Sequence, residues 1–378
     1  MLSPLLINIS EKQFEFPQHG GDKSFACESA DVGEDQILDF SASINPLGPP
    51  KSVLAELPHL GQHIAVYPDS QSTVLKNQLG KNFNIEPEGM VVTNGSMELI
   101  FLLPHLFTMG DEVLIVSPCF SEYKKAFDLA KIVTNSFVCG ENEYSGSAKS
   151  IFSELEKNPR IKGVVLGHPN NPTGRLWDKR ELQELLEFCE REKRFLIVDE
   201  TFIEFCEPGQ SLIGQIETKE FLILIRSLTK FYALPGLRLG YGTMHPKHAK
   251  IIEKFRPSWS VNALAQHLGC TALLDEQFAI ESRNNNAKQK QNLFQALSKM
   301  KPLKVFPSDA NFILFQLLNE FSSEQFYLLL IQKGILLRNC GNFSGLDFSY
   351  FRVAVRGEAD NQKLLTALDN CFVELSVG

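Results

Sequence analysis

A lysine and an arginine eight residues apart give the first indication of chemistry in the sequence. Lys230 comes shortly after the expected strand 221–225, at the end of a short segment that includes Ser227. Partial desolvation lowers the pKa of a lysine and lets its amine form a Schiff base. Arg238, held between Gly and Pro residues, could bind a phosphate and lower the pKa of Lys230 further by like-charge repulsion. A lysine after a strand is usually a solvated surface residue, so the combination is the informative feature.

Two further positions follow other expected strands. Asp199 ends the apolar run 195–198, where a carboxylate can pair with a protonated pyridine nitrogen and keep that ring able to accept electrons. Gly95 and Ser96 open an expected helix (97–107), whose free backbone N–H groups and dipole suit a phosphate dianion. Each feature is weak alone, because a strand-end Asp often caps the next element and Gly-Ser turns are common.

Phe120 and Asn171 complete this set. Phe120 follows the expected strand 112–116 and could stack on the face of the same ring, although an aromatic side chain in a core is more often simple packing. Asn171 lies in the loop after the apolar strand 163–167, where its amide could donate to the 3′ oxygen of the ring. The order and spacing of the whole set are more restrictive than any one member.

The elements that must position these residues alternate between strands and helices from about residue 90. This alternation, with continuous apolar strands, predicts an α/β fold with a mostly parallel sheet covered on both faces. Ligands bind beyond the carboxyl ends of such strands, so the polar segments should meet at one edge of the sheet. Long helices (263–274 and 281–299) before strands at 310–316 and 350–355 indicate a second, smaller α+β domain.

The predicted domain limits follow from this change of pattern. Residues 76–261 are expected to form the large domain, and residues 262–378 the small α+β domain. Residues 1–75 are expected to join the small domain, because their turn-rich motifs do not fit the alternation of the sheet. Within them, residues 20–36 are polar and rich in Gly, Asp and Glu, and are predicted to form a loop.

Composition excludes several classes of function. A chain of 378 residues is long enough for two structural units, and a formal charge of −8 without basic runs is unfavourable for nucleic-acid binding. The eight cysteines show no CxxC spacing, so free thiols in the cytoplasm are expected, and no metal-ligand pattern is present. The sequence shows neither a signal peptide nor an apolar run that could span a membrane. An anionic substrate is compatible, because a few arginines can reverse the field inside a cleft.

In this order the motifs resemble those of the fold-type-I enzymes of the aspartate aminotransferase superfamily, which use pyridoxal 5′-phosphate (PLP). The resemblance extends over nearly the whole chain. It implies a large PLP-binding domain with a seven-stranded sheet and a smaller α+β domain. The motifs that carry it are Asn171-Pro172-Thr173-Gly174, Asp199-Glu200, Ser227-Leu228-Thr229-Lys230 and Arg238.

The resemblance also assigns roles around the cofactor. Lys230 is implied to be the Schiff-base lysine and Asp199 the partner of the pyridine nitrogen. Tyr67 looks like the tyrosine that such enzymes lend to the cofactor phosphate of a neighbouring subunit, which implies a homodimer with shared active sites. Arg352 looks like the arginine that binds the substrate α-carboxylate. The other implied cofactor contacts are Asn171 at the 3′ oxygen, Phe120 on the ring face, and a phosphate cup of Gly95, Ser96, Ser227 and Arg238.

Within the superfamily the chain most resembles two groups, the histidinol-phosphate aminotransferases and the L-threonine-O-3-phosphate decarboxylases of cobalamin biosynthesis. Three features favour the decarboxylases. His19, followed by two glycines, resembles their N-terminal motif that reaches the substrate phosphate. The segment DFSASINPLGPP (39–50), which contains the implied substrate contact Asn45, is similar to theirs. Phe202 replaces the tyrosine usual in the aminotransferases, which removes one hydrogen bond to the 3′ oxygen, worth about 1 kcal/mol.

The expected substrate is a phosphorylated amino acid. Arg338 is similar in both groups and is implied to bind the substrate phosphate bidentately, whereas a lone His19 near a terminus could instead be a solvated turn residue. Decarboxylation is expected if the carboxylate is held perpendicular to the cofactor ring, and transamination if hydrogen is held there. An aminotransferase acting on histidinol phosphate or a similar compound is the alternative. A regulator that keeps the cofactor without turnover is disfavoured by the intact Lys230, Asp199 and Arg352.

Overall fold

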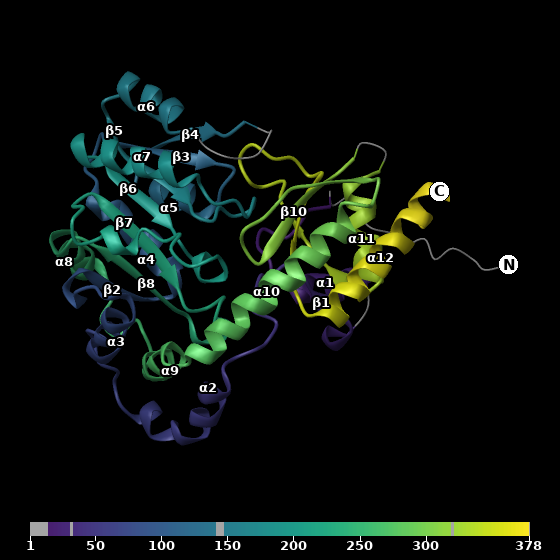
Figure 1. Cartoon of the computed structure of the whole chain (residues 1–378), viewed down its shortest axis with the longest axis horizontal. Coiled ribbons are helices and arrows are strands. Elements are labelled where there is room, and N and C mark those ends of the chain that lie inside the picture. The colour runs from purple at the N-terminus through teal and green to yellow at the C-terminus, as the bar shows by residue number, and fades with distance from the viewer. Residues whose placement is uncertain (1–13, 31–32, 141–146, 319–320, 378) are drawn as a thin grey trace.

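A seven-stranded sheet forms the centre of the larger part of the molecule (Figure 1). The computed structural model describes residues 14–30, 33–140, 147–318 and 321–377. The strand order is β2-β8-β7-β6-β5-β3-β4, and all neighbours are parallel except β8, which is antiparallel to β2 and β7. The predicted, mostly parallel sheet is therefore confirmed. The bounds are Met90–Asn94 (β2), Glu112–Ser117 (β3), Val133–Val138 (β4), Ile161–Gly167 (β5), Phe195–Asp199 (β6), Leu222–Ser227 (β7) and Leu239–Met244 (β8).

The sequence-based expectations did not include β4 and β8. Strand β4 lies at the edge of the sheet, where only half-buried and exposed side chains leave no apolar signal. Strand β8 contains Gly240 and Gly242, which lower the propensity for a strand. A Cβ on Gly240 would collide with the backbone nitrogen of Ser96, so the glycine lets helix α4 (Gly95–Leu102) lie directly on the sheet.

Helices cover both faces of this sheet, as expected for buried parallel strands. Successive residues of each central strand point into two separate apolar clusters. One cluster contains Val164, Leu196 and Leu224 and the other contains Val165, Ile197 and Ile223. Besides α4, the helices of this part are α3 (Thr73–Phe83), α5 (Glu122–Leu129), α6 (Ala148–Lys157), α7 (Lys179–Arg191), α8 (Pro246–Phe255) and α9 (Ala263–Leu273).

A four-stranded antiparallel sheet forms the centre of the smaller part. Its order is β12-β13-β10-β9, with bounds Arg338–Asn339 (β12), Tyr350–Ala354 (β13), Phe312–Leu317 (β10) and Leu303–Val305 (β9). Helices α10 (Glu276–Leu297), α11 (Ser323–Gln332) and α12 (Glu358–Val377) contribute apolar side chains to the same core. Helix α10 runs from the larger part into this one and connects the two (Figure 1).

The N-terminal residues pack with the smaller part. Strand β1 (Leu38–Asp39) pairs in parallel with β11 (Ile335–Leu336), and helix α1 (Lys23–Ala30) buries Ala26 in the same core. The loop predicted for residues 20–36 is therefore wrong over α1. The helix is only eight residues long and depends on tertiary packing, so its sequence carries little periodic signal.

The side chains of Leu60 and Leu75, which follow the N-terminal segment along the chain, pack with the larger part. Leu60 and Leu75, together with Ala265 and Leu268 of α9, belong to one apolar cluster of the seven-stranded sheet. The segment that contains α2 (Lys51–Glu56) projects away from both sheets (Figure 1). The domain limits at residues 75 and 261 stay predictions. Among the described residues, no helix is long and apolar enough to cross a membrane.

Candidate active site

A cavity of about 280 Å³ lies beyond the carboxyl ends of the parallel strands, and residues from both parts of the chain line it. Most of the residues that the sequence singled out belong to this set. Gly95, Asp199 and Asn45 do not line it but contact members of it, Asn45 through its backbone N–H to the carbonyl oxygen of Lys230 (3.0 Å), whereas Tyr67 does not line it. The lining residues are His19, Gly20, Ser41, Ala42, Ser96, Met97, Phe120, Asn171, Thr201, Phe202, Ser227, Thr229, Lys230, Arg238, Arg338, Phe343 and Arg352.

Lys230 lies in this cavity just after β7. Burial, together with the positive charges of Arg352 and Arg238, lowers the pKa of its amine to about 8. The sequence predicted the effect of desolvation and of Arg238 but not that of Arg352, which comes from the smaller part. A depressed pKa makes the neutral, nucleophilic amine available near physiological pH.

The start of α4 and Arg238 form a cluster of anion-binding donors. Gly95 has φ of +74°, and a Cβ there would come within 2.6 Å of Arg238 Nη2, so the glycine permits the guanidinium to approach the helix N-terminus. Ser96 and Ser227 line the same cavity. Free helix N–H groups, two hydroxyls and an arginine are donors that a phosphate dianion accepts. This cluster fits the phosphate of a cofactor held at Lys230.

Asp199 is fixed by a partner that the sequence did not reveal. Its carboxylate accepts a hydrogen bond from the hydroxyl of Tyr123, at the start of α5, and a second bond of 2.8 Å from the backbone N–H of Thr201. Burial raises the pKa of Asp199, and these two hydrogen bonds act in the opposite direction. Burial also raises the pKa of Tyr123, so the phenol remains a donor. Tyr123 lies three residues after Phe120, but a single sequence offers no signal that would link it to Asp199.

Tyr123→Phe should reduce kcat by about tenfold, because a hydrogen bond to a charged group contributes about 1.5–3 kcal/mol. Loss of a bond that favours the carboxylate raises the pKa of Asp199, so the acidic limb of the kcat/KM profile should move to higher pH. Tyr350→Phe, at a buried tyrosine outside the cavity, is the matched control and should change neither quantity. An unshifted profile for Tyr123→Phe would show that Asp199 does not depend on the phenol.

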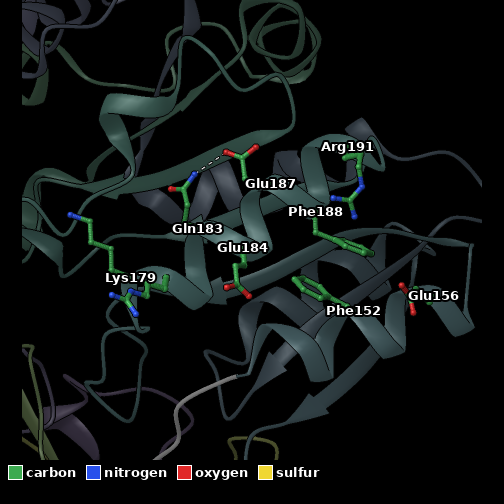
Figure 2. Close-up of a pocket in the computed structure, with 9 residues that line it drawn as sticks. Phe152, Glu156, Lys179, Gln183, Glu184, Glu187, Phe188 and Arg191 are labelled. Carbon is green, nitrogen blue, oxygen red and sulfur yellow. Dashed lines mark hydrogen bonds between the residues drawn. The ribbon is translucent and has the colours of Figure 1, made fainter.

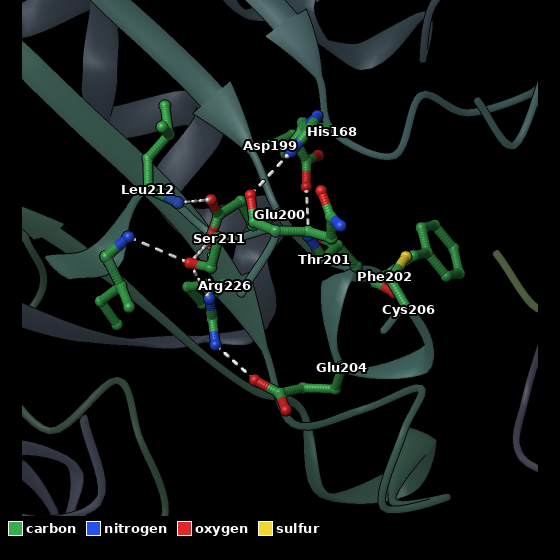
Figure 3. A network of polar contacts seen from close by, with 12 residues as sticks. His168, Asp199, Glu200, Thr201, Phe202, Glu204, Cys206, Ser211, Leu212 and Arg226 are labelled. Atoms are coloured by element: carbon green, nitrogen blue, oxygen red, sulfur yellow. Dashed lines mark hydrogen bonds and ion pairs between the residues drawn. The ribbon is translucent and has the colours of Figure 1, made fainter. Parts of the chain in front are cut away.

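A buried polar network anchors the loop that follows Asp199 (Figure 3). Glu200 accepts hydrogen bonds from the backbone N–H of Leu212 (2.8 Å), from Ser211 Oγ (2.6 Å) and from Arg226 Nη1 (2.6 Å). Arg226, which is itself buried on β7, donates to Glu204 as well. Since these partners connect β6, β7 and the loop 200–212, the network holds Asp199 and Thr201 in fixed positions.

Arg352 and Asn171 form one unit in the cavity. Arg352 Nη1 donates to Asn171 Oδ1, and Arg352 Nη2 donates to the carbonyl oxygen of Ser41 at 2.9 Å. Burial lowers the pKa of Arg352 to about 10. Its Nε and the hydroxyl of Thr201 are buried, and neither has a hydrogen-bond partner within the described part of the chain. Such unpaired polar atoms in a cavity are suited to a bound polar ligand.

Arg338 lies directly opposite Arg352 in the antiparallel pair of β12 and β13. Nη1 already donates to the carbonyl oxygens of Pro17 (3.0 Å) and Asn339, and Nη2 donates to the carbonyl oxygen of Gln18 (2.6 Å) and to Asn342 Oδ1 (2.6 Å). Bidentate binding of a phosphate through these two nitrogens, as the sequence implied, therefore requires the exchange of one partner at each nitrogen. Arg338 also holds the segment that carries His19 at the cavity.

His19 reaches the cavity from the N-terminal segment. Its Nε2 lies 3.1 Å from Glu122 Oε1, and its ring centroid lies 6.0 Å from that of Phe120. Glu122 is buried at the start of α5 and is a neighbour that the sequence did not indicate. The imidazole is half exposed, with its second nitrogen available to a ligand.

Asn45 and Tyr67 are the two predicted site residues that the structure does not bring into the cavity. The amide nitrogen of Asn45 donates to the carbonyl of Phe231 (2.8 Å) and to Ser282 Oγ (2.7 Å), so Asn45 supports the loop after Lys230. A role in substrate binding would be indirect. The side chain of Tyr67 is 80% exposed and lies against Trp259, with 4.8 Å between the ring centroids.

A second, open groove lies between α6 and α7 and shares no lining residue with the cavity at Lys230 (Figure 2). It is lined by charged side chains such as Lys179, Glu184 and Arg191 around the stacked rings of Phe152 and Phe188. Gln183 and Glu187 are bonded to one another there. Despite its larger volume of about 800 Å³, this groove contains none of the residues that the sequence singled out, and the cavity at Lys230 is the candidate active site.

Known proteins share this fold and are similar to the chain over most of its length. Residues 35–368 match the family "Aminotransferase class I and II". The chain is 37% identical, over 94% of its length, to the adenosylcobalamin biosynthesis bifunctional protein CobDQ of Leptospira interrogans, and it spans 41% of that protein. It is 34% identical to the threonine-phosphate decarboxylase of Salmonella typhimurium, covering 95% of this chain and 97% of that one. The crystal structure of the histidinol-phosphate aminotransferase from Clostridium acetobutylicum gives a TM-score of 0.83 at 33% identity, covering 88% of this chain and 98% of that one.

The fold and the cavity define a PLP-dependent enzyme of fold type I. The chain belongs to the class I and II aminotransferase family, and its cofactor is PLP. The residues present fit that cofactor, since the cavity combines an amine of depressed pKa, a carboxylate held by Tyr123, the donor cluster at α4 and an unpaired buried hydroxyl at Thr201.

Proposed function

We propose that this enzyme decarboxylates L-threonine O-3-phosphate to (R)-1-amino-2-propanol O-2-phosphate and CO2, the reaction that supplies the linker in cobalamin biosynthesis. The observation that carries the proposal is the pair formed by Arg338 and Arg352. Both side chains are buried, they face each other across two antiparallel strands, and neither forms an ion pair with any carboxylate of the described residues. Like charges opposite one another are unfavourable, so a ligand with two anionic groups would compensate them.

Threonine phosphate has these two groups on a short skeleton. Arg352 would hold its carboxylate, while Arg338 and His19 would hold its phosphate. The threonine-phosphate decarboxylase of Salmonella typhimurium, 34% identical over almost the full length, supports the same substrate. Phe202, which cannot hydrogen-bond to the cofactor, is consistent with a departure from the aminotransferases.

Bound PLP accepts the electron pair that remains on the substrate α-carbon when the bond perpendicular to its ring breaks. In decarboxylation the bond between the α-carbon and the carboxylate breaks, CO2 leaves, and the electron pair stays on the α-carbon until a proton replaces the carboxylate. Lys230, whose amine lies in the cavity, would return that proton. Asp199 would keep the proton on the pyridine nitrogen, which maintains the electron demand of the ring.

Transamination of histidinol phosphate is the second candidate. The similarity to the Clostridium acetobutylicum enzyme favours it. Histidinol phosphate, however, has a hydroxymethyl-derived phosphate ester and no carboxylate, so it would leave Arg352 without an anionic partner in that half-reaction. The cavity of about 280 Å³ is also near the lower end of the range for ligand pockets, although it must hold both cofactor and substrate.

Arg338→Ala should lower kcat/KM for threonine phosphate by about 10- to 100-fold, because a charge-assisted hydrogen bond contributes about 1.5–3 kcal/mol. Unphosphorylated threonine should be a poor substrate whose turnover hardly changes. Arg194→Ala is the matched control, because Arg194 is a buried arginine that likewise donates to backbone carbonyl oxygens but lies outside the cavity. If Arg338→Ala impaired threonine and threonine phosphate equally, Arg338 would not bind the phosphate and the proposal would lose its main support.

We also propose a homodimer in which Tyr67 serves the cofactor phosphate of the neighbouring subunit, because Tyr67 is exposed and remote from its own cavity. Mixing Lys230→Ala chains with Tyr67→Phe chains should give more activity than either variant alone. A mixed dimer would contain one site with both substitutions and one site with neither. A monodisperse monomer in sedimentation that is active at that size would exclude shared sites.

A further inference from the structure

The guanidinium of Arg352 lies over an aromatic side chain, Phe312, that does not line the cavity. Its guanidinium carbon lies 4.9 Å from the ring centroid of Phe312, which is fully buried at the start of β10. The Phe202 ring meets Phe312 edge-on, with 4.9 Å between centroids and an interplanar angle of 80°. Phe312, which is fully buried, therefore connects Arg352 with Phe202, and both of these side chains line the cavity.

The register of the strands explains the contact of Phe312 with Arg352. Leu314 of β10 is the Cα partner of Arg352 and Ala354 is the partner of Phe312, so Phe312 lies diagonally across from Arg352 on the same face. Diagonal neighbours remain within reach when one is aromatic and the other is long. Although β10 belongs to the smaller part, Phe312 packs in the apolar cluster of the larger part, together with Phe202.

The remaining contacts of Arg352 lie at the edge of its guanidinium. Asn171 and the carbonyl of Ser41 accept from its two terminal nitrogens, and these bonds limit where the group can move in its own plane. The guanidinium carbon lies over the Phe312 ring, 4.9 Å from its centroid, and this contact limits movement of the group toward the ring. Arginine binds a carboxylate with two parallel hydrogen bonds in a shared plane, so the tilt of the guanidinium sets the tilt of a bound carboxylate.

We infer that Phe312, supported by Phe202, is a positioning residue that selects which substrate bond breaks, by fixing the plane of Arg352. The inference rests on the proposed decarboxylation. The substrate is held at its amine by the cofactor and at its phosphate by Arg338 and His19, so the carboxylate is the third point that fixes rotation about the bond between nitrogen and α-carbon. A small error in that rotation moves hydrogen toward the perpendicular position.

The competing reaction has a distinct product. If the bond between the α-carbon and hydrogen breaks instead, Lys230 would take that proton, and a 2-oxo acid would form by one of two routes. The electron pair on the α-carbon would expel the β-phosphate, after which water replaces the amino group and releases 2-oxobutanoate and ammonia, or the amino group and two electrons would pass to PLP while water supplies the oxygen of the 2-oxo acid. Only the second route would leave the cofactor in its amine form and remove the absorption band of the lysine-linked cofactor. The ratio of 2-oxo acid to CO2 therefore reports the orientation of the carboxylate rather than the overall rate.

Phe312→Leu removes the ring face and keeps an apolar side chain. The holoenzyme should then release about tenfold more 2-oxo acid per CO2 than the wild type, the size expected from loss of one desolvated cation–π contact. Where the second route operates, the absorption band should fade correspondingly faster during turnover. Phe202→Leu should change the ratio in the same direction but less, because it acts through Phe312.

Phe315→Leu is the matched control. Phe315 lies on the same strand and is equally buried, but it packs in the core of the smaller part on Phe351. It should leave the ratio unchanged, whatever it does to stability. Binding of the product, aminopropanol phosphate, by the Phe312→Leu holoenzyme should match the wild type in a spectroscopic titration, because the product has no carboxylate.

The outcomes separate the inference from the proposed function. If wild-type enzyme releases no CO2 from threonine phosphate, the proposed function is wrong. If wild type decarboxylates and Phe312→Leu gives the wild-type ratio, the function stands and the role of Phe312 is refuted. An equal rise of the ratio in Phe315→Leu would also refute it, since general loosening of the small core would then explain the effect.

Discussion

Lys230→Ala should abolish turnover, with at least a roughly 10³-fold loss of kcat, because no other amine of the described residues lines the cavity beyond the carboxyl ends of the strands. The variant should still bind PLP through the donor cluster at α4 and Arg238, but without the absorption band of the lysine-linked cofactor. Spectra and steady-state rates of the reconstituted variant measure both effects. A variant that kept its activity would contradict the assignment of Lys230.

The same variant should change how stability depends on pH in the cofactor-free enzyme. The pKa of Lys230 is about 8 in the folded chain, below the ordinary lysine value, so between about pH 8 and 10.5 the unfolded chain binds the additional proton. The free energy of unfolding of the wild type should therefore rise through this window relative to that of Lys230→Ala. Parallel pH dependence of the two proteins in denaturant titrations would show that the lysine is not desolvated.

Asp199→Ala should retain PLP but lose about 10²- to 10³-fold in kcat. Removing one partner of a buried ion pair costs about 3–5 kcal/mol, and here the unpaired partner would be the protonated pyridine nitrogen, which would give up its proton. A ring without that proton withdraws electrons poorly. The loss should exceed that of Tyr123→Phe, because the phenol acts only through the carboxylate.

Asp178→Ala provides the matched control for Asp199→Ala. Asp178 caps α7 through bonds of 2.9 and 3.1 Å to the backbone N–H groups of Arg180 and Glu181, away from the cavity. Its loss should cost about 1 kcal/mol of stability and leave kcat unchanged. Turnover of Asp199→Ala within a few-fold of the wild type would show that this carboxylate does not pair with the cofactor ring.

Local signals explain why much of the fold and site could be predicted from the sequence. Continuous apolar runs marked the central strands, and the polar residues that follow them lie at one edge of a parallel sheet because of its topology. This logic located Asn171, Asp199 and Lys230, and the Asp178 cap on α7 was equally local. The resemblance to a known family added Arg338 and Arg352, which periodicity would not have singled out.

The features that escaped prediction depend on contacts between distant segments. The bond from Tyr123 to Asp199 joins residues 76 positions apart. The contact of Phe312 with Arg352 depends on the register of two strands. Helix α1 forms because the smaller core receives Ala26, and β8 tolerates its glycines because α4 packs against them. The prior engagement of Arg338 with the N-terminal carbonyls likewise needs the folded chain.

The most direct test of the account is the fate of L-threonine phosphate labelled in its carboxyl carbon, incubated with the holoenzyme and followed by NMR. In parallel, histidinol phosphate is incubated with the holoenzyme and 2-oxoglutarate. We expect labelled CO2 and aminopropanol phosphate in equal amounts, without addition of a 2-oxo acid, and no glutamate from histidinol phosphate. Label retained in a 2-oxo acid, or glutamate formed from histidinol phosphate at a comparable rate, would contradict the decarboxylase assignment and identify an aminotransferase.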